Sequence, residues 1–572
     1  MYNVLKLSSI SSVMLLTYSG FMFIMSCWFM MNDNCLFIEW VVLNLSSCSM
    51  KMSIVVDNIS LSFSSIVCLI SGCVMMFSSS YMSNDVFLNR FIWLVVLFVL
   101  SMNMLIFISS LPALLLGWDG LGIVSFILVI YYQNNKSLGA GMLTILANRI
   151  GDVMILVSIG ILVILGYWDI MVIEEFLLSL YLSLCILIAS MTKSAQMPFS
   201  SWLPAAMAAP TPVSALVHSS TLVTAGIFLL FRFFTILEKW DLFSPLLLMI
   251  SVFTMFMAGV GANYENDLKK IVALSTLSQL GMSMMSLALG LSMLTIFHLY
   301  THALFKALLF LCVGVIIHSS AGNQDVRLMN MLYYQLPLTS SCMNIANTSL
   351  CGGLFLSGFY SKDLILELSL FNSTSLFMVM MIFLSVVLTI TYSMRLLFIS
   401  VCGMNKGVGF HSKGDLNIYF NFSMLILSSA AITFGAMLQY FFFMEFELIF
   451  FLLSYWQKKD VFGIIVIGVF ISMMLCKKIY NKKYMSKLDS FLSLMWFLVP
   501  LSTYPFVKFS VMTSTYILKC IDCGWVEILG GQGGFLTVMN FSKINQIVQF
   551  KLFNFLIMFM VVLMIITYFI FM

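Results

Sequence analysis

Residues 292–317 read SMLTIFHLYTHALFKALLFLCVGVII, and this stretch decides the fold class. Among its side chains, only His298, His302 and Lys306 are ionisable residues of the Lys, Arg, Asp, Glu or His types. A helix that crosses the hydrocarbon core of a bilayer needs ~20 consecutive apolar residues. The stretch is therefore predicted to be a membrane-spanning helix that carries three ionisable groups inside it.

The composition of the whole chain agrees with a membrane protein. Of 572 residues, 62% are hydrophobic and 9% are charged, against ~45–50% and ~25% in soluble domains. So few charged side chains cannot cover the surface of a soluble fold of this size. The 27 Lys and Arg residues exceed the 23 Asp and Glu residues by only four and form no dense basic stripe, so we expect no nucleic-acid partner.

Similar apolar stretches recur along the chain with short polar breaks. We therefore expect an all-α polytopic membrane protein of about 15–16 transmembrane helices. Residues 36–56 alternate in polarity and are predicted to form an extended hairpin outside the bilayer. The expected spans are 10–31, 54–78, 91–110, 112–132, 140–165, 176–195, 203–232, 244–263, 271–290, 292–317, 328–349, 352–372, 374–398, 417–440, 461–476 and 553–572.

The breaks suggest six regions. A lysine cluster and a glycine-rich run, GGQGG at 530–534, mark a segment that is predicted to lie along the membrane surface. By the positive-inside rule, the lysines of this cluster should face the inner side: Lys477, Lys478, Lys482, Lys483 and Lys487. The regions are 1–85 (N-terminal helices and hairpin), 86–263 (first repeat), 264–400 (second repeat), 401–480 (C-terminal transmembrane helices), 481–552 (lateral amphipathic helix) and 553–572 (terminal span).

The cysteines do not indicate a metal site. Thirteen are scattered through apolar runs, where Cys behaves as a small hydrophobe. The one close pair, Cys520 and Cys523, has no second pair or histidines at short spacing, which a zinc or iron–sulfur site would need.

The informative residues are the few ionisable ones inside the apolar runs. A charge at the bilayer centre costs about 2.5–3.5 kcal/mol on insertion scales, so each needs a partner or a wet cavity. A recurring set indicates an ion path, whereas a single member can be a structural ion pair or a side chain that snorkels to the surface. The set comprises Asp119, Lys193, His218, His298, His302, Lys306, His318, Lys362, Asp363 and Glu367.

Spacing places part of this set on one helix face. His298, His302 and Lys306 follow at i, i+4 and i+8 and stack along the helix as a column of exchangeable protons. A bis-histidine haem is the alternative, but histidines one turn apart on one helix cannot bind opposite faces of one iron. For His218 and His318, a satisfied core histidine stays an open alternative.

Helix breakers accompany the buried lysines. Four prolines, at 198, 204, 210 and 212, follow Lys193, and three glycines, at 352, 353 and 358, precede Lys362. Interrupted helices at membrane depth are tolerated only inside protein or beside a wet cavity, and two in matching positions indicate an ion path built from inverted repeats. The first repeat would pair Asp119 with Lys193, and the second would pair Lys306 with Lys362.

A nearby carboxylate would also make Lys193 a switch, because it favours the charged ammonium. If Asp119 approaches, the lysine holds its proton, and if Asp119 moves away, the proton leaves. Arg149 and Asp152 are three residues apart and share a helix face. As a supporting ion pair they either link one half of the path to the next or fix a helix end.

These residues resemble a known family, the antiporter-like membrane subunits of respiratory complex I. Within it, GFYSKD at 358–363 is similar to the chain 5 branch, since chain 4 relatives usually carry an acid at the position of Lys362. The resemblance covers about residues 50–572 and rests on GWDGLG at 117–122, NRIGD at 148–152, KSAQ at 193–196, PTPVSALVH at 210–218 and THALFKA at 301–307.

The resemblance implies a subunit at the distal end of the membrane arm of NADH:ubiquinone oxidoreductase, in the mitochondrial inner membrane. In the family, the acid at Asp119 pairs with Lys193, Lys306 and the histidines carry protons across the middle, and Lys362 with Asp363 faces the exit. The implied partners are other complex I subunits, especially chain 4 and small accessory membrane subunits, together with lipid, of which cardiolipin is one candidate. FMN, iron–sulfur clusters, NADH and ubiquinone would bind elsewhere, with no redox site, cofactor or metal on this chain.

Two departures and two rival functions remain. Most relatives carry Glu where this chain has Asp119, and many begin with one more helix, which we do not expect here. One rival is a stand-alone cation/proton antiporter, against which the long surface segment 481–552 argues. The other is a purely structural arm subunit whose lysines are fixed in ion pairs.

Overall fold

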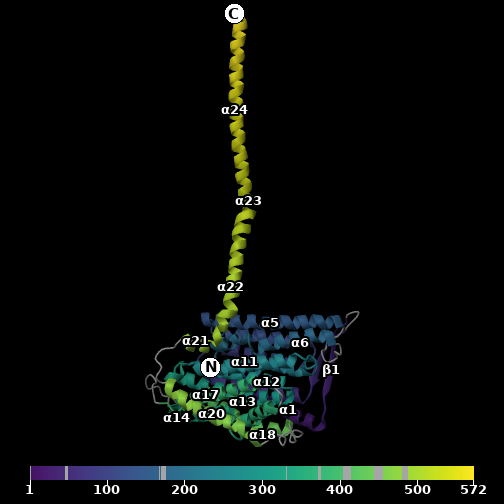
Figure 1. Cartoon of the computed structure of the whole chain (residues 1–572), viewed down its shortest axis with the longest axis vertical. Coiled ribbons are helices and arrows are strands. Elements are labelled where there is room, and N and C mark those ends of the chain that lie inside the picture. Colours follow the sequence, from purple (N-terminus) through teal and green to yellow (C-terminus); the bar gives the residue numbers. More distant parts are fainter. Residues whose placement is uncertain are drawn as a thin grey trace. The chain divides into compact units, whose positions relative to one another are not determined.

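The structure is a computed structural model, and it describes residues 2–44, 49–165, 168, 176–329, 331–371, 375–403, 414–415, 417–442, 455–479 and 487–571. The chain divides into two compact units, Met1–Leu498 and Val499–Met572. The first unit is a bundle of helices, and the second is a run of consecutive helical segments (Figure 1).

Helices make up almost all of the first unit. In chain order they are α1 (Tyr2–Asn32), α2 (Asn58–Tyr81), α3 (Leu88–Phe107), α4 (Leu111–Val129), α5 (Asn135–Leu165), α6 (Phe176–Lys193), α7 (Trp202–Ala205), α8 (Thr211–Leu216), α9 (Leu222–Arg232), α10 (Phe234–Leu237), α11 (Phe243–Tyr264), α12 (Leu268–Ala288), α13 (Ser292–Ser319), α14 (Leu332–Gln335), α15 (Pro337–Cys351), α16 (Leu364–Phe371), α17 (Leu376–Ser400), α18 (Ile418–Phe442), α20 (Tyr455–Ile479) and α21 (Lys487–Ser493). Short π-helical segments, η4 (Val217–Thr221) and η6 (Phe359–Asp363), precede α9 and α16.

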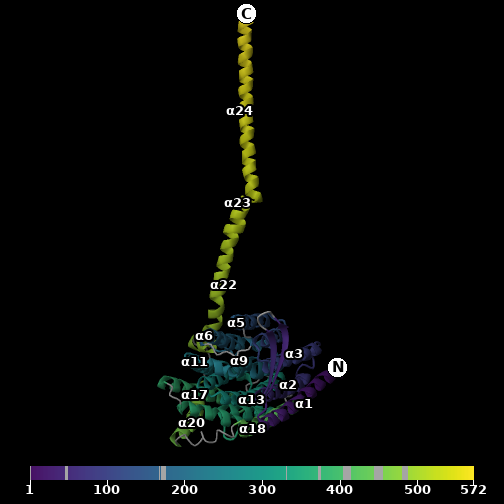
Figure 2. The ribbon, with the colours of Figure 1, turned by 90° about the vertical axis from the view of Figure 1, so that its right-hand side faces the viewer.

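Helix α13 lies in the middle of this bundle in both views (Figures 1 and 2). It packs against α2, α8, α12, α15 and α18. The most apolar windows of α12, of α13 and of residues 211–232 are completely buried inside the unit. A helix that is hydrophobic on all sides is expected at such a position, so the stretch with three ionisable groups forms the core.

Twelve helices of the described ranges are long and apolar enough to cross a membrane. The other four expected spans are short or interrupted. The described apolar parts of two are Leu180–Lys193 and Phe462–Met474. The third is α15, with 15 residues, and the fourth is broken into η6 and α16. The all-α polytopic class is confirmed, and the inverted repeat stays a prediction.

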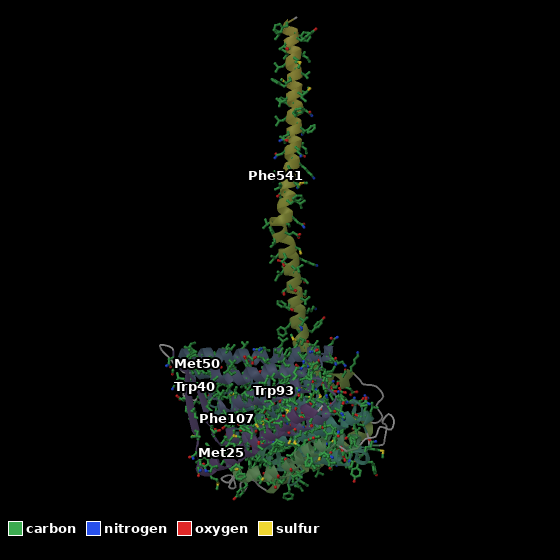
Figure 3. All side chains as sticks on the ribbon, turned by 180° about the vertical axis from the view of Figure 1, so that it is seen from behind. Met25, Trp40, Met50, Trp93, Phe107 and Phe541 are labelled. Carbon is green, nitrogen blue, oxygen red and sulfur yellow. The ribbon has the colours of Figure 1, made fainter. Side chains whose placement is uncertain are left out.

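The expected hairpin is present. Strands β1 (Leu36–Asn44) and β2 (Ser49–Val56) pair antiparallel, and Ser109 N–H donates to Ser53 O across 3.1 Å, which attaches β2 to the bundle. Its position outside the bilayer stays a prediction. Figure 3 labels apolar side chains on the outside of this unit, namely Met25, Trp40, Met50, Trp93 and Phe107.

Local sequence explains several helix ends. Asp57 caps α2 by accepting from the Ser60 N–H at 2.8 Å, and the Ser60 hydroxyl accepts from the Asp57 N–H at 2.9 Å. Proline near the first position starts α4 and α15, where its missing N–H costs nothing. Gly352, with φ +87°, ends α15 in the left-handed conformation that glycine adopts without strain.

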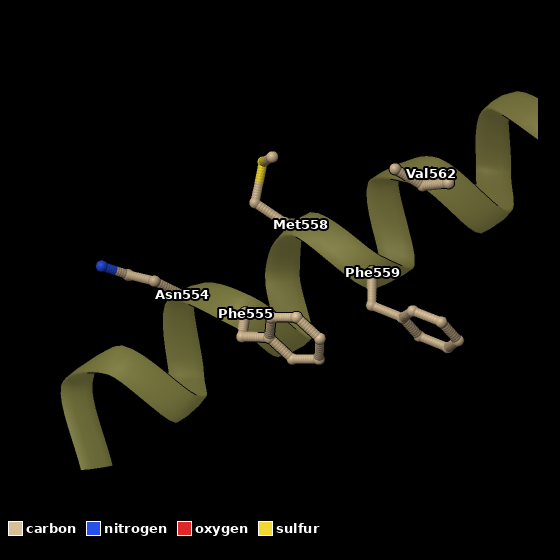
Figure 4. Close-up of a pocket in the computed structure, with 5 residues that line it drawn as sticks. All are labelled: Asn554, Phe555, Met558, Phe559 and Val562. Atoms are coloured by element: carbon tan, nitrogen blue, oxygen red, sulfur yellow. The ribbon is translucent and has the colours of Figure 1, made fainter. Parts of the chain in front are cut away.

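The second unit contains most of α22 (Leu498–Ile517), then η8 (Leu518–Val526), α23 (Glu527–Leu529) and α24 (Gly531–Phe571). Helix α24 runs through the expected boundary between the lateral segment and the terminal span, so those two regions stay predictions. The hollow in Figure 4 lies on α24 alone and is part of its exposed face, not an enclosed site. Of the expected lysine cluster, Lys482 and Lys483 lie outside the described residues.

Candidate functional site

All three predicted site lysines lie inside the first unit. Lys193 and Lys306 are 0% exposed and Lys362 is 2% exposed. The expectation that ionisable groups lie within the apolar bundle is therefore met for all three. Because a buried ammonium is expensive, the contacts of each Nζ decide what the group can do.

Lys193 is the last residue of α6 and reaches across to α4. Its Nζ donates to Trp118 O at 3.0 Å and lies 4.8 Å from the centroid of the Trp118 ring. Carbonyl and ring both favour a cation. The chain turns directly after Lys193, since Ala195 has φ +55°, so the lysine lies at an interruption as the proline-rich sequence predicts.

The predicted direct pair between Asp119 and Lys193 is not among the ion pairs of the described residues. Asp119 instead lies 3.8 Å from Arg149, whose guanidinium is 3.3 Å from Asp152. Trp118 Nε1 donates to Asp152 at 2.8 Å. Asp119 follows Trp118 on α4, so it is directed to the Arg149 side while the Trp118 carbonyl meets the ammonium. The expected ion pair between Arg149 and Asp152 is present.

The column on α13 forms as its spacing predicts. His298 and His302 are both 1% exposed, and their ring centroids are 6.4 Å apart. His298 Nδ1 lies 3.1 Å from Ser361 Oγ, which also lies 3.0 Å from Thr301 Oγ1. Within the described part of the chain, neither ring nitrogen of His302 has a hydrogen-bond partner.

The second pair of lysines is held by hydroxyl groups. Lys306 Nζ donates to Ser275 Oγ at 2.6 Å. Lys362 Nζ donates to Thr389 Oγ1 at 2.9 Å and to Leu350 O at 3.3 Å. Oδ1 of Asp363 is buried and has no hydrogen-bond partner among the described residues. Neither lysine makes an ion pair with a carboxylate in that part of the chain.

Both predicted helix interruptions contain a π-helical segment. His218 lies in η4 after the prolines, and Lys362 lies in η6 after the glycines. Single π turns inside helices occur frequently at functional sites. His218 is 1% exposed, its ring centroid is 6.1 Å from that of Trp202, and neither ring nitrogen has a partner among the described residues. The core alternative therefore stays open for His218.

His318 lies apart from the column. It is exposed at the end of α13, beside Tyr81 at 5.5 Å and Phe420 at 5.8 Å between ring centroids. With Asp85 and Tyr132 it lines an open hollow of about 440 Å³. The core alternative is wrong for His318, because α13 is long enough to carry this histidine out of the bundle.

Two buried cations escape the sequence pattern. Lys269, 6% exposed, donates to Ala209 O at 3.1 Å, beside the first interruption. Arg395, 5% exposed, donates to the carbonyl oxygens of Ala262 and Asn263 at 3.0 and 2.6 Å at the end of α11. Both lie near the ends of apolar runs, where sequence alone suggests a flanking surface charge.

The described residues contain no group of three His, Cys, Asp or Glu side chains that could hold a metal ion. The described site residues carry ammonium, imidazole and hydroxyl groups inside an apolar bundle.

Comparison with known proteins assigns the chain to a family. The family described as "NADH-Ubiquinone oxidoreductase (complex I), chain 5 N-terminus" matches residues 40–92, and "NADH dehydrogenase subunit 5 C-terminus" matches 392–571. "NADH:quinone oxidoreductase/Mrp antiporter, TM" matches 108–389. NADH-ubiquinone oxidoreductase chain 5 of Anopheles gambiae is 44% identical over 98% of both chains. The chain 5 of Lumbricus terrestris is 48% identical over 88% of both chains.

The chain belongs to the NADH-ubiquinone oxidoreductase chain 5 family. It is thus an antiporter-like membrane-arm subunit of complex I, the proton-translocating NADH:ubiquinone oxidoreductase, and its partners are other complex I subunits. It is a multi-pass membrane protein. The stand-alone antiporter is therefore the wrong alternative.

The chain also shares its fold with chains of two solved structures. A chain in the structure of the Mrp complex from Dietzia sp. DQ12-45-1b superposes with a TM-score of 0.72 at 22% identity, over 92% of this chain and 61% of that one. A chain of the archaeal membrane-bound sulfane sulfur reductase gives 0.64 at 20% identity, over 76% and 75%. At these identities the likeness concerns the fold alone.

Proposed function

We propose that the chain conducts protons within complex I through its buried ionisable groups, in the mitochondrial inner membrane. The observation that carries the proposal is the burial of three lysines, at most 2% exposed, without a carboxylate ion pair in the described residues. Static ammonium groups there would cost several kcal/mol each. The groups of the path are Asp119, Lys193, His218, His298, His302, Lys306, Lys362 and Asp363, with Arg149 and Asp152 in support.

The proposed path begins at a cluster of two carboxylates and two cations. Two carboxylates, Asp119 and Asp152, share Arg149 at 3.8 and 3.3 Å. Trp118 connects this cluster to Lys193, since its indole donates to Asp152 and its carbonyl accepts from the lysine. When Arg149 holds both carboxylates, Lys193 loses stabilisation and releases its proton. When Arg149 withdraws, the carboxylates favour the ammonium. Conformational changes in the arm would operate this switch.

The middle of the path is the α13 column. His302 and the two ring nitrogens of His218 lack protein partners among the described residues. An unsatisfied buried polar group costs about 1–3 kcal/mol, and buried waters normally bind such groups. This supports a hydrated route from the first interruption to His302, His298 and Lys306.

The exit side combines Lys362 with Asp363 at the second interruption. Lys306 and Lys362 have only hydroxyl and carbonyl hydrogen-bond partners among the described residues. Two buried ammonium groups in one bundle repel each other, so sharing one proton lowers the cost. The structural-arm alternative would instead keep the lysines in ion pairs.

The exposed surface of the second unit indicates which neighbours cover it. None of the 41 residues of α24 is buried within the chain, and the helix is about 60 Å long at ~1.5 Å per residue. This supports coverage by neighbouring chain 4, small accessory membrane subunits and lipid, with cardiolipin as a candidate. The redox cofactors would lie on other subunits.

The test is Lys193→Ala in assembled complex I. Protons translocated per NADH oxidised are measured in sealed vesicles, and the proposal expects this ratio to fall. The matched control is Lys136→Ala, which removes an exposed lysine at the start of α5 and should leave the ratio unchanged. An undiminished ratio in Lys193→Ala rejects the proposal.

A further inference from the structure

Helix α17 presents a column of buried hydroxyl groups to the lysines. Ser385, Thr389 and Ser393 follow at i, i+4 and i+8 and therefore share one face. They are 0, 0 and 1% exposed, and Tyr392 beside them is 1% exposed. Each of the three hydroxyls donates to a backbone carbonyl three residues earlier on α17, at 2.6, 2.7 and 2.9 Å, and can still accept a hydrogen bond on its oxygen.

Each of the two lysines donates a hydrogen bond to a hydroxyl group of a neighbouring helix. Lys362 Nζ donates to Thr389 Oγ1 at 2.9 Å on α17. Lys306 Nζ donates to Ser275 Oγ at 2.6 Å on α12. A route between the lysines therefore needs a group that connects α17 with α12.

Tyr392 is that group. Its hydroxyl, from α17, lies 3.1 Å from Ser278 Oγ on α12, and Ser278 Oγ donates to Ser275 O at 2.9 Å. Tyr392 is three residues beyond Thr389, and Ser278 is three beyond Ser275, so each interval along a helix is a single turn. Neighbours at this spacing lie ~5–6 Å apart at Cβ, so the link requires water molecules that connect their hydroxyl groups.

A second contact extends the same face. Cys351 Sγ lies 2.9 Å from Ser393 Oγ. Cys351 directly precedes Gly352, at which α15 ends. Hydroxyl and thiol groups of α12, α15 and α17 thus meet in this region, with Ser278 beside Tyr392 and Cys351 beside Ser393.

We propose that Tyr392 is a proton-transfer residue that links Lys306 to Lys362 through Ser275, Ser278 and Thr389, beside the histidine column. This rests on the proposed function. Each hydroxyl accepts one proton on an oxygen lone pair and gives up its own. One proton leaves the Lys306 ammonium, one reaches the Lys362 amine, and every hydroxyl ends neutral.

The proposed link through Tyr392 uses different residues from the histidine contact at the second helix interruption. His298 and Thr301 reach Ser361, the residue before Lys362, from α13. Tyr392 belongs to α17, and within the described part of the chain its hydroxyl contacts Ser278 rather than either histidine. A variant at Tyr392 therefore separates the hydroxyl link from the histidine column.

The test is Tyr392→Phe in assembled complex I, which removes one oxygen and keeps the ring. The matched control is Tyr300→Phe, since Tyr300 is 0% exposed and its hydroxyl also lies on a serine, Ser62, at 2.9 Å. We expect coupled NADH oxidation to fall about tenfold in Tyr392→Phe, with a larger solvent deuterium isotope effect. Tyr300→Phe should change neither.

Three outcomes overturn the proposal. They are a wild-type rate and isotope effect in Tyr392→Phe, an equal loss in both variants, or a lower rate with an unchanged isotope effect. Ser278→Ala should reproduce the larger isotope effect from the α12 side. Lys306→Met distinguishes the two proposals: if it abolishes translocation while Tyr392→Phe has no effect, only the hydroxyl link fails, and if Lys306→Met translocates normally, the proposed function fails.

Discussion

The two lysine regions solve the same physical problem differently. Lys193 belongs to the same cluster as Asp119 and Asp152, and both carboxylates contact Arg149. We therefore expect the charge of Lys193 to depend on how strongly Arg149 holds the two carboxylates. Lys306 and Lys362 are held by serine and threonine hydroxyls, which stabilise a proton without fixing it by opposite charge. We therefore propose that the first region acts as a switch and that the second conducts protons.

The helix breaks differ in the same way. The helix after the first break, α9, ends at Arg232, which forms an ion pair with Asp57 at 2.5 Å. The second break is held by close packing, since a Cβ on Gly358 would collide with the carbonyl oxygen of Ser349. Ionic control and steric control should respond to different substitutions, and the following variants test this.

The largest effect is expected at the second break. Gly358→Ala forces a methyl group against the Ser349 carbonyl, and overpacking of this kind costs about 3 kcal/mol or more where backbone cannot yield. We expect displaced Lys362 and loss of translocation, measured as protons per NADH. Gly160→Ala is the control, because a Cβ there meets no atom within 4 Å; an equally active Gly358→Ala complex would remove the steric account.

Asp57→Asn tests the ionic clamp of the first break. Burial raises the pKa of Asp57, but the Arg232 guanidinium and the Ser60 amide lower it by more, so the net shift is downward. Asparagine still caps α2, so the loss of the ion pair should dominate, at roughly 1–3 kcal/mol for this partly buried pair. Thermal unfolding of the purified complex measures it.

The pH dependence of the same variant gives a second readout. A carboxylate with a depressed pKa contributes stability above its unfolded pKa of about 3.9, and this contribution is lost as the pH falls through the lower folded value. The difference in melting temperature between wild type and Asp57→Asn should therefore be constant near neutral pH and shrink on acidification below about pH 4. A difference that grows in acid contradicts the clamp.

Arg149→Gln tests whether Arg149 controls proton release from Lys193. It frees Asp119 and Asp152 to stabilise the Lys193 ammonium, which should then release its proton more slowly. A change of 1.4 kcal/mol gives about a tenfold lower coupled turnover, while stability should change by less than about 1 kcal/mol because Arg149 is 48% exposed. Faster turnover would reverse the proposed role of the arginine.

The smallest effect is expected for Asp119→Glu. The side chain keeps its charge and gains one methylene, and Asp119 is 30% exposed, so it has room to adjust. Coupled turnover should stay within about twofold of wild type. A large loss of turnover would mean that the 3.8 Å contact between Asp119 and Arg149 requires the shorter side chain of aspartate.

Much of this arrangement could be predicted from the sequence. The α13 column follows from the i, i+4, i+8 spacing of His298, His302 and Lys306, since helix geometry alone stacks them. The breaks at Lys193 and Lys362 follow from proline and glycine, which act locally. The hairpin at residues 36–56 and the all-α membrane class follow from periodicity and composition.

The contacts between distant helices could not be predicted in this way. The partner of Lys193 is the Trp118 carbonyl rather than the Asp119 carboxylate, because the rotation of α4 is set by packing. Tyr392 looks like a core aromatic in sequence, and only the approach of α17 to α12 brings its hydroxyl to Ser278. Lys269 lies among flanking charges and is buried by residues 60 positions away.

The central claim is that the buried groups are joined by a wet route. The most direct measurement is an experimental map of the assembled complex at a resolution that shows ordered water molecules. The account predicts waters at the free nitrogens of His302 and between Tyr392 and Thr389, forming a continuous line from Lys306 to Lys362. Dry apolar packing between these groups, or lysines turned outward to the lipid headgroups, would contradict it.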